Sequence, residues 1–163
     1  QEGIAAARGE YIIVQDADLE YDPADYPALL AAAEEPGVYA VFGSRVLGMR
    51  REGVGFPLSL FSLGRRVTNL IFHILYASPL TDIHTCYKLA RREVLQSLRL
   101  RSKGFDLDME LAGKLVRGAR ARGERVVEVP IRYRPRSVAE GKKIRWWDGI
   151  AALWAILRFR FVD

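Results

Sequence analysis

The chain has 163 residues and a formal net charge of +5, and half of its residues are hydrophobic. This length is enough for one domain with a sizeable core. A pI near 9.6 favours anionic partners: nucleotide phosphates, lipid phosphates, an acidic membrane surface or nucleic acid. Cys86 is the single cysteine, which excludes an internal disulfide. No uncharged apolar run reaches the roughly 18 residues that a bilayer-spanning helix needs.

The first part of the chain alternates predicted helices and strands. Residues 1–9 are typical of the last turns of a helix that ends at a glycine, so we expect the N-terminal portion of the domain to be missing. Residues 11–15 predict a buried strand, residues 22–35 a helix with proline in its first turn, and residues 38–43 a second strand. Residues 45–57 hold three glycines and three arginines and predict a mobile loop.

The second part continues this alternation. The expected elements are a helix at 58–75, a turn and short strand at 81–90, a short helix at 91–98, an amphipathic helix at 105–122, a strand at 126–133, a basic loop at 134–145 and a final helix at 146–161. Strands that alternate with helices favour an α/β domain whose sheet is at least partly parallel.

A pair of acidic residues follows the first strand. Asp16 and Asp18 are two positions apart, and side chains at that spacing point to the same side of a strand. Two carboxylates on one side suit Mg²⁺ or Mn²⁺, and such a metal would hold the diphosphate of a nucleotide. Ligands of open α/β sheets bind outside the carboxyl ends of strands. The alternative is a solvated turn.

Five motifs occur in a fixed order along the chain. They are QDADLEYDP at 15–23, GSR at 43–45, LTD with TCYKL at 80–89, GFDLDME at 104–110, and EVPIRY with the following basic segment from 128. The chain resembles family 2 inverting glycosyltransferases of the dolichol-phosphate mannose synthase type. It is most similar to bacterial members that end in a helix rather than in membrane spans.

The resemblance implies a GT-A-type fold, a three-layer α/β/α arrangement with a mixed, mostly parallel sheet. The chain would be the C-terminal part of a single catalytic domain covering residues 1–163, with an unpaired sheet edge where the missing N-terminal portion belongs. The implied reaction transfers a sugar from a nucleotide diphosphate sugar, of the GDP-mannose or UDP-glucose type, to a polyprenyl phosphate with inversion.

The resemblance also implies roles for individual residues on the donor side. Asp16 and Asp18 would hold the metal and the diphosphate, and Asp18 would be catalytic. Glu20 is either a third metal ligand or an acid on the helix side. Asp82 is implied as an active-site carboxylate that orients the sugar or assists the acceptor, the alternative being a helix-start residue.

The acceptor phosphate is expected to meet arginines. The resemblance implies that Arg45 is a phosphate ligand and a catalytic residue, since arginine binds phosphate bidentately, the alternative being a loop arginine in solvent. Arg65 and Arg66 interrupt an apolar helix, which is costly unless they meet an anion or extend to water, and Thr68 completes the pattern. Which of the two arginines binds stays open.

Three acids begin the helix at 105–122, namely Asp106, Asp108 and Glu110. Related families with alcohol acceptors place a catalytic base in such a stretch. For at least two of the three we favour the simpler interpretation, that they complement the helix dipole.

The basic loop at 134–145 is interpreted as a lid that closes on both phosphates. Its donor-binding residues would be Arg136, Ser137, Lys142 and Lys143. The adjacent Trp146 and Trp147 would anchor the amphipathic helix 146–161 at an anionic membrane surface, which implies a peripheral protein at the cytoplasmic face. The alternative is that the apolar stripe of this helix packs inward against the core, as is more frequent for amphipathic helices.

Two other functions remain open. The chain could be a family 2 transferase with a hydroxyl acceptor, or a non-catalytic basic module that binds membranes or nucleic acid. We expect no nucleic acid as a partner, because no nucleic-acid motif is present and the ordered carboxylates would repel a polyanion. His73, His84 and Cys86 do not have the spacing of a metal site.

Overall fold

The computed structural model describes residues 1–163 except 18, 56–59, 103, 105, 137–145 and 163. Its helices are α1 (Glu2–Ala6), α2 (Tyr26–Ala33), α3 (Arg45–Arg51), α4 (Leu60–Tyr76), α5 (Arg92–Ser97), α6 (Asp106–Ala121) and α7 (Trp146–Phe161), with a short 3₁₀ helix at Pro23–Asp25. Its strands are β1 (Tyr11–Val14), β2 (Val38–Ser44), β3 (Lys88–Arg91) and β4 (Arg125–Pro130).

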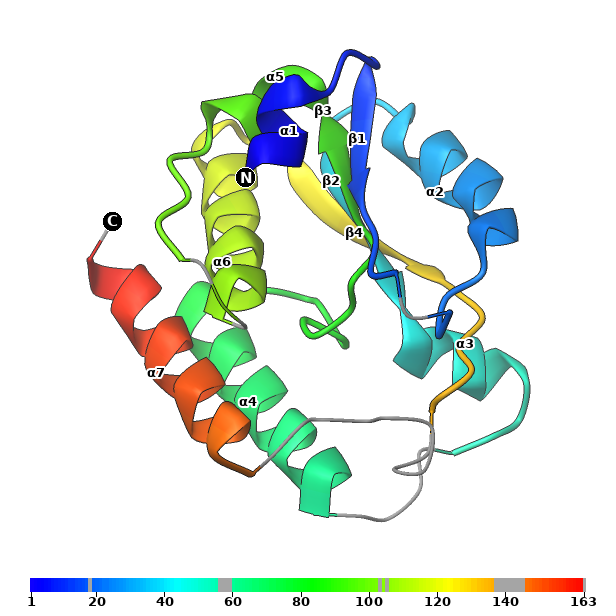
Figure 1. Ribbon diagram of the computed structural model, residues 1–163, viewed down its shortest axis with the longest axis vertical. Helices are drawn as coiled ribbons and strands as arrows, with labels where there is room; N and C mark the ends of the chain where they lie inside the picture. The colour runs from blue at the N-terminus through cyan, green and yellow to red at the C-terminus, as the bar shows by residue number, and fades with distance from the viewer. Residues whose placement is uncertain (18, 56–59, 103, 105, 137–145, 163) are drawn as a thin grey trace.

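The four described strands form one mixed sheet in the order β1-β3-β2-β4 (Figure 1). β3 is antiparallel to both β1 and β2, and β2 is parallel to β4. A mixed sheet is confirmed, and two of the three pairings of the described strands are antiparallel, because β3 runs opposite to both of its neighbours. β1, β2 and β4 nevertheless run the same way, so their carboxyl ends meet at one edge of the sheet.

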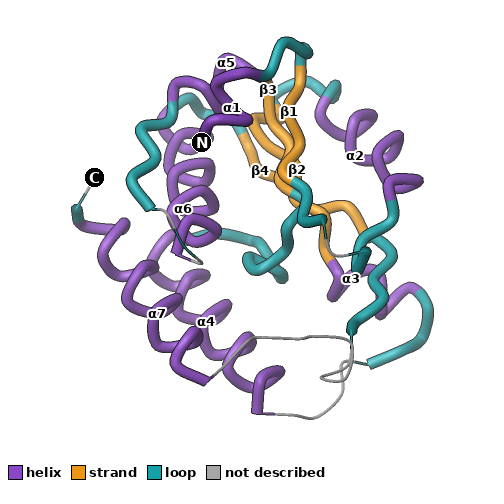
Figure 2. Tube along the Cα trace, viewed as in Figure 1, coloured by secondary structure: helices purple, strands orange, loops and turns teal. Residues whose placement is uncertain are grey.

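Helices cover both faces of this sheet, as Figures 1 and 2 show. Side chains alternate along β2: Val41 faces the α2 side, where it packs with Leu29 and Tyr87, while Phe42 faces the α6 side. The α6 side forms the larger core and includes α4 and α7. The three-layer α/β/α arrangement is therefore confirmed.

The largest departure from the expected elements is α3. Residues 45–57 were expected to form a mobile loop, but the segment begins with a two-turn helix. The Ser44 hydroxyl caps it by accepting a hydrogen bond from the Leu47 amide at 3.2 Å. Gly48 fits α3 against the segment after β4, since a Cβ at this position would lie 1.9 Å from the Ile131 carbonyl oxygen. Glycine is thus required here by close approach and not by loop flexibility.

Several boundaries also differ from the expectation. The first helix ends at Ala6 instead of Gly9, and the last strand ends at Pro130 instead of Tyr133. β1 was expected to be buried, but all four of its residues are only half-buried, because it is an edge strand of the described sheet. The final helix occupies the expected range. Among the described helices, none combines the length and apolar character that crossing a membrane requires.

Candidate active site

An ion pair between Arg45 and Asp82 lies at the carboxyl edge of the sheet. β2 ends at Ser44, so Arg45 begins α3 at that edge. Its Nε and NH2 atoms donate to the two Asp82 carboxylate oxygens at 2.7 and 2.8 Å, and its amide donates at 3.0 Å. The Asp82 side chain is fully buried. Burial works to raise the pKa of Asp82, but the Arg45 charge and its hydrogen bonds outweigh it, so that this pKa lies below its usual range.

Glu128 supports the loop that carries Asp82. From β4, beside β2, its carboxylate accepts hydrogen bonds from the Thr81 and Asp82 amides, each at 2.9 Å. The Thr81 hydroxyl also donates to Glu128 at 2.9 Å and lies 2.9 Å from the Ser44 hydroxyl. Burial raises the pKa of Glu128, which these hydrogen bonds oppose. Two strand ends thus fix one loop.

Helix α4 holds the same loop from the other side. Asn69 receives a hydrogen bond from the Ile83 amide and donates to the Leu80 carbonyl, both at 3.0 Å. His84 Nε2 lies 2.6 Å from the Thr68 hydroxyl. Burial and nearby cations together, against the opposing effect of Asp82, lower the pKa of His84 to about 4. His84 is therefore neutral at pH 7.

The predicted acceptor residues come together only in part. Burial lowers the pKa of Arg65. The Asp82 charge raises this pKa, and the charges of Arg45 and Arg66 lower it. Arg65 therefore belongs to the same electrostatic cluster as Arg45 and Asp82. Two expected residues have internal partners instead. The Thr68 hydroxyl donates within its own helix, to the Gly64 and Arg65 carbonyls at 3.0 and 3.1 Å. The Arg45 guanidinium donates two hydrogen bonds to Asp82, and its central carbon lies 5.1 Å from the centre of the Tyr133 ring.

The acids of α6 have specific partners, so dipole complementation is an incomplete account of them. Asp108 forms an ion pair with Lys88, whose side chain is fully buried in β3. Glu110 is buried, pairs with Lys114 at 2.9 Å, and accepts hydrogen bonds from the amides of residues 101 and 102 at 2.8–3.0 Å. Asp106 caps the preceding turn by accepting from the Gly104 amide at 3.1 Å.

The turn after β1 is anchored through its backbone. The Asp16 amide donates to the Cys86 sulfur at 2.7 Å, and Cys86 is buried as expected, while the Asp16 side chain is exposed. Leu19 is exposed and left-handed, with a φ of 61°, and the chain turns back there. Asp18, a predicted metal ligand, lies outside the described residues.

Glu20 joins this turn to the basic segment. Its carboxylate accepts hydrogen bonds from the Tyr133 hydroxyl and the Arg136 amide, both at 2.9 Å, and its carbonyl accepts from the Arg134 amide at 3.0 Å. It is 9% exposed. Glu20 is thus engaged with the protein. The expected lid residues Ser137, Lys142 and Lys143 lie outside the part of the chain that the structure describes.

The donor chemistry of Asp16 fits a hard divalent cation, because an exposed carboxylate at a strand end offers oxygen ligands. The described residues, which leave out Asp18, contain no group of three acidic, histidine or cysteine side chains that could hold a metal ion.

Three supporting residues were not singled out from the sequence. Lys88 begins β3 and Glu128 lies within β4, each next to apolar residues, and a charged residue in such a segment must be paired when it is buried. That pattern was visible in the sequence. Tyr133, which covers Arg45, carried no comparable signal.

Sequence comparison with known proteins supports the family resemblance that the motifs indicate. The family model described as "Glycosyl transferase family 2" matches residues 1–99. The chain is 28% identical over 156 residues to a low-salt glycan biosynthesis hexosyltransferase of Haloferax volcanii, covering 96% of this chain and 35% of that protein. It is 28% identical over 172 residues to the undecaprenyl-phosphate mannosyltransferase of Micrococcus luteus, covering 94% and 65%. It is 30% identical over 146 residues to the dolichol-phosphate mannosyltransferase of Pyrococcus furiosus, covering 87% and 40%.

The chain thus spans between about a third and two thirds of the length of these relatives. Its fold is shared with solved structures, among them the two that follow. Glucosyl-3-phosphoglycerate synthase from Mycobacterium tuberculosis, in complex with Mn²⁺, UDP-glucose and glycerol 3-phosphate, has a TM-score of 0.67 at 16% identity and covers 99% of this chain and 53% of that one. Mannosyl-3-phosphoglycerate synthase from Rubrobacter xylanophilus has a TM-score of 0.62 at 18% identity and covers 96% and 46%. The expected GT-A-type fold is confirmed.

Proposed function

This chain belongs to glycosyl transferase family 2, and we propose that its protein transfers a hexose from a nucleotide diphosphate sugar to a polyprenyl phosphate with inversion. The observation that carries the proposal is the cationic cluster of Arg45 and Arg65 around Asp82, at the same sheet edge as Asp16. The named activities of the Micrococcus and Pyrococcus relatives support a polyprenyl phosphate acceptor and a donor of the GDP-mannose type. UDP-glucose is the alternative donor.

The proposed acceptor needs little base catalysis. A phosphate monoester has a second pKa of about 6, so its oxygen is largely ionised at pH 7 and ready to attack. The protein must instead bring two anions together, the donor diphosphate and the acceptor phosphate, and positively charged groups make this possible. Arg65, or its neighbour Arg66, takes the acceptor phosphate, and Arg45 contributes its charge from its position on Asp82. Asp82 remains ionised and acts by holding the Arg45 guanidinium in place, because both of its oxygens accept hydrogen bonds from Arg45.

The donor diphosphate lies at the turn after β1. Asp16 and Asp18 would hold Mg²⁺ or Mn²⁺, which supplies charge neutralisation for the leaving diphosphate. Glu20 is assigned to positioning instead of direct ligation, because its oxygens already accept hydrogen bonds from Tyr133 and Arg136. Arg136, Ser137, Lys142 and Lys143, all in the basic segment 134–145, would bind the donor diphosphate and close over both phosphates.

A second candidate acceptor is a small phosphorylated hydroxyl compound. The solved structures of similar fold act on or bind phosphoglycerate-type molecules by their names. The same arginines would hold the phosphate of such an acceptor, and a carboxylate would then have to activate its hydroxyl group. With a lipid acceptor, the protein would work peripherally at the cytoplasmic face of a membrane.

The test is a transfer assay with the full-length protein. GDP-mannose and UDP-glucose are each combined with undecaprenyl phosphate in detergent or with 3-phosphoglycerate, in Mn²⁺ and in EDTA. We expect Mn²⁺-dependent transfer to the lipid phosphate. Transfer to 3-phosphoglycerate alone would overturn the lipid acceptor while keeping the transferase, and no transfer in any combination would overturn both.

A further inference from the structure

Tyr133 lies between the turn that carries Asp16 and the ion pair of Arg45 with Asp82. Its hydroxyl donates a hydrogen bond to the Glu20 carboxylate at 2.9 Å. The central carbon of the Arg45 guanidinium lies over the Tyr133 ring, 5.1 Å from the ring centre. One side chain thus contacts the proposed donor turn through its hydroxyl group and an arginine of the proposed acceptor site through its ring.

The backbone supports the contact between Tyr133 and Glu20 on both sides. Tyr21, next to Glu20, forms an isolated antiparallel bridge with Tyr133. The Arg134 amide donates to the Glu20 carbonyl at 3.0 Å, and the Arg136 amide donates to the Glu20 carboxylate at 2.9 Å. Because backbone hydrogen bonds flank the tyrosine hydroxyl, Glu20 restricts where the Tyr133 ring can lie.

The Arg45 guanidinium is in turn held from two directions. Asp82 accepts hydrogen bonds from its Nε and NH2 atoms at 2.7 and 2.8 Å, while Tyr133 contacts it from the ring side. The Arg45 side chain is only 11% exposed. Contacts from two directions restrict a planar guanidinium more than either contact alone. A charge that acts on a bound phosphate depends on such placement, because a displacement of about 1 Å is enough to weaken a reaction strongly.

We propose that Glu20 and Tyr133 are positioning residues for the acceptor phosphate: Glu20 places the Tyr133 ring, and the ring places the Arg45 guanidinium. An acid two residues beyond Asp18, on the donor turn, then serves the acceptor side of the reaction instead of the metal. This rests on the proposed function, since it takes Arg45 to act on the acceptor phosphate.

Steady-state kinetics of the full-length protein test the proposal, with undecaprenyl phosphate in detergent, Mn²⁺, and GDP-mannose or UDP-glucose. Tyr133→Leu removes the ring and the hydroxyl group, whereas Tyr133→Phe removes only the hydroxyl group. We expect the KM for the lipid phosphate to rise about tenfold in Tyr133→Leu and about threefold in Tyr133→Phe. The KM for the donor and the Mn²⁺ requirement should change by less than about twofold.

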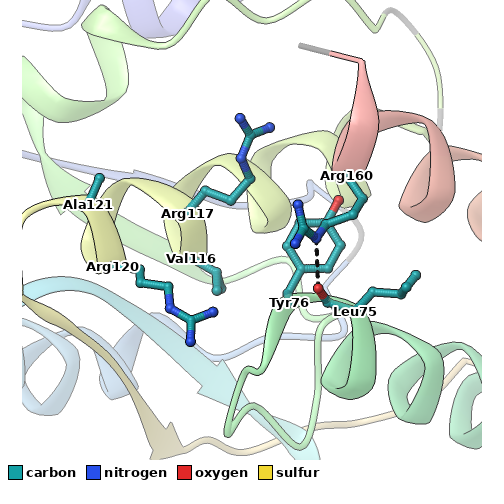
Figure 3. Close-up of a pocket in the computed structure, with 7 residues that line it drawn as sticks. All are labelled: Leu75, Tyr76, Val116, Arg117, Arg120, Ala121 and Arg160. Atoms are coloured by element: carbon teal, nitrogen blue, oxygen red, sulfur yellow. Dashed lines mark hydrogen bonds between the residues drawn. The ribbon is translucent and has the colours of Figure 1, made fainter.

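The matched control is Tyr76→Phe, which also removes one tyrosine hydroxyl group. The Tyr76 hydroxyl donates to the Ile156 carbonyl at 3.0 Å. It lies at a cavity of about 270 Å³ where α4, α6 and α7 end, and this end of α6 leads into the start of β4, away from the Asp82 centre. Figure 3 shows this cavity, which is also lined by Leu75, Val116, Arg117, Arg120, Ala121 and Arg160. Tyr76→Phe should lower the urea denaturation midpoint and leave both KM values unchanged.

A double variant tests whether Glu20 acts through Tyr133. Glu20→Gln should raise the KM for the lipid phosphate, and adding Tyr133→Phe should raise it little further, because both changes affect one contact. Independent, multiplying effects would contradict a shared contact. A raised donor KM and Mn²⁺ requirement in Glu20→Gln, with the acceptor KM unchanged, would make Glu20 a metal ligand and overturn the proposal.

The Tyr133 variants separate positioning from a structural role. An unchanged acceptor KM in Tyr133→Leu, together with a lower denaturation midpoint, would leave the contact purely structural and overturn this proposal alone. Absence of transfer by the wild type with every donor and acceptor would overturn the proposed function, and this proposal with it.

Discussion

The Asp82 centre and the Asp16 turn are two carboxylate regions at the same edge of the sheet, and they are built in opposite ways. Asp82 is fully buried, and its two oxygens accept three hydrogen bonds from Arg45. The Asp16 side chain is exposed, and its turn is anchored through the backbone amide. A buried, fully bonded carboxylate shapes the loop that carries it, whereas an exposed one can exchange water for a ligand. We therefore expect substitutions at the Asp82 centre to lower mainly stability, and substitutions at the Asp16 turn to lower mainly activity.

Asp82→Asn should have the largest effect on stability. The amide keeps the shape but leaves the buried Arg45 charge without its counter-ion, which costs about 3–5 kcal/mol of unfolding free energy. Urea denaturation measures this loss. Arg125→Ala, which breaks the exposed Arg125–Glu35 pair, is the control and should cost about 0–1 kcal/mol. Equal denaturation midpoints for Asp82→Asn and the wild type would remove the contrast between the two regions.

Asp16→Asn should separate activity from stability. The amide keeps the shape of the side chain but loses the negative charge that would hold the proposed metal, so transfer should fall by about 10²-fold or more. The free energy of unfolding should change by less than about 0.5 kcal/mol, as for most surface substitutions. Transfer assays and urea denaturation on the same preparation check both. A variant that transfers at the wild-type rate shows that the exposed turn is only a solvated turn.

Glu128→Gln tests whether the Asp82 centre also serves activity. The glutamine NH₂ group would face amide donors in place of a carboxylate oxygen, which should cost about 1–3 kcal/mol of stability. Because the loop shifts while Arg65 remains, we expect the KM for the acceptor to rise more than the KM for the donor. The control is Glu93→Gln on the exposed start of α5. If both KM values stay constant while stability falls, Glu128 has a purely structural role.

The effect expected at His84 is confined to acid pH. Its pKa is about 4 in the folded chain and about 6.5 when unfolded. Between these values the unfolded state binds a proton that the folded state does not, so stability falls as pH decreases from about 6.5 towards 4, by about 1–3 kcal/mol. His84→Gln should remove this part of the pH dependence in urea denaturation between pH 7 and pH 4.5. A variant with an unchanged pH profile would mean that His84 titrates normally.

Much of the fold could be predicted from local patterns. The apolar strand before Asp16, the amphipathic helix at 105–122 and the final helix were found because hydrophobic periodicity reports local structure directly. The direction of β3 could not be found in this way, since nothing local fixes which neighbours a strand pairs with. α3 was missed because its glycines suggested a loop, while Gly48 is set by contact with a segment more than 80 residues away.

The sequence predicted which residues belong to the candidate site, but it did not predict which of them contact one another. The motifs identified Arg45, Asp82 and Glu20 as important, yet their mutual partners depend on the tertiary structure. Nothing in the sequence indicates that Asp82 accepts hydrogen bonds from the Arg45 guanidinium, or that Glu20 accepts them from Tyr133 and Arg136. The charged residues of the strands, Lys88 and Glu128, do indicate from the sequence that ion pairs or hydrogen bonds form there, because buried charges require partners.

The strand order of the sheet determines how the chain can fold. β2 and β3 are separated by two helices, β1 pairs with β3, and β2 pairs with β4 from near the end of the chain. No pairing of the described strands closes a hairpin, so each must enclose a long loop before its hydrogen bonds form, and such topologies fold slowly. Since Glu128 arrives with β4, we expect the Asp82 loop to reach its final form only after that strand has docked. During synthesis from the N-terminus, the ribosome must therefore release residue 130 before the sheet edge that carries the Asp82 loop can assemble.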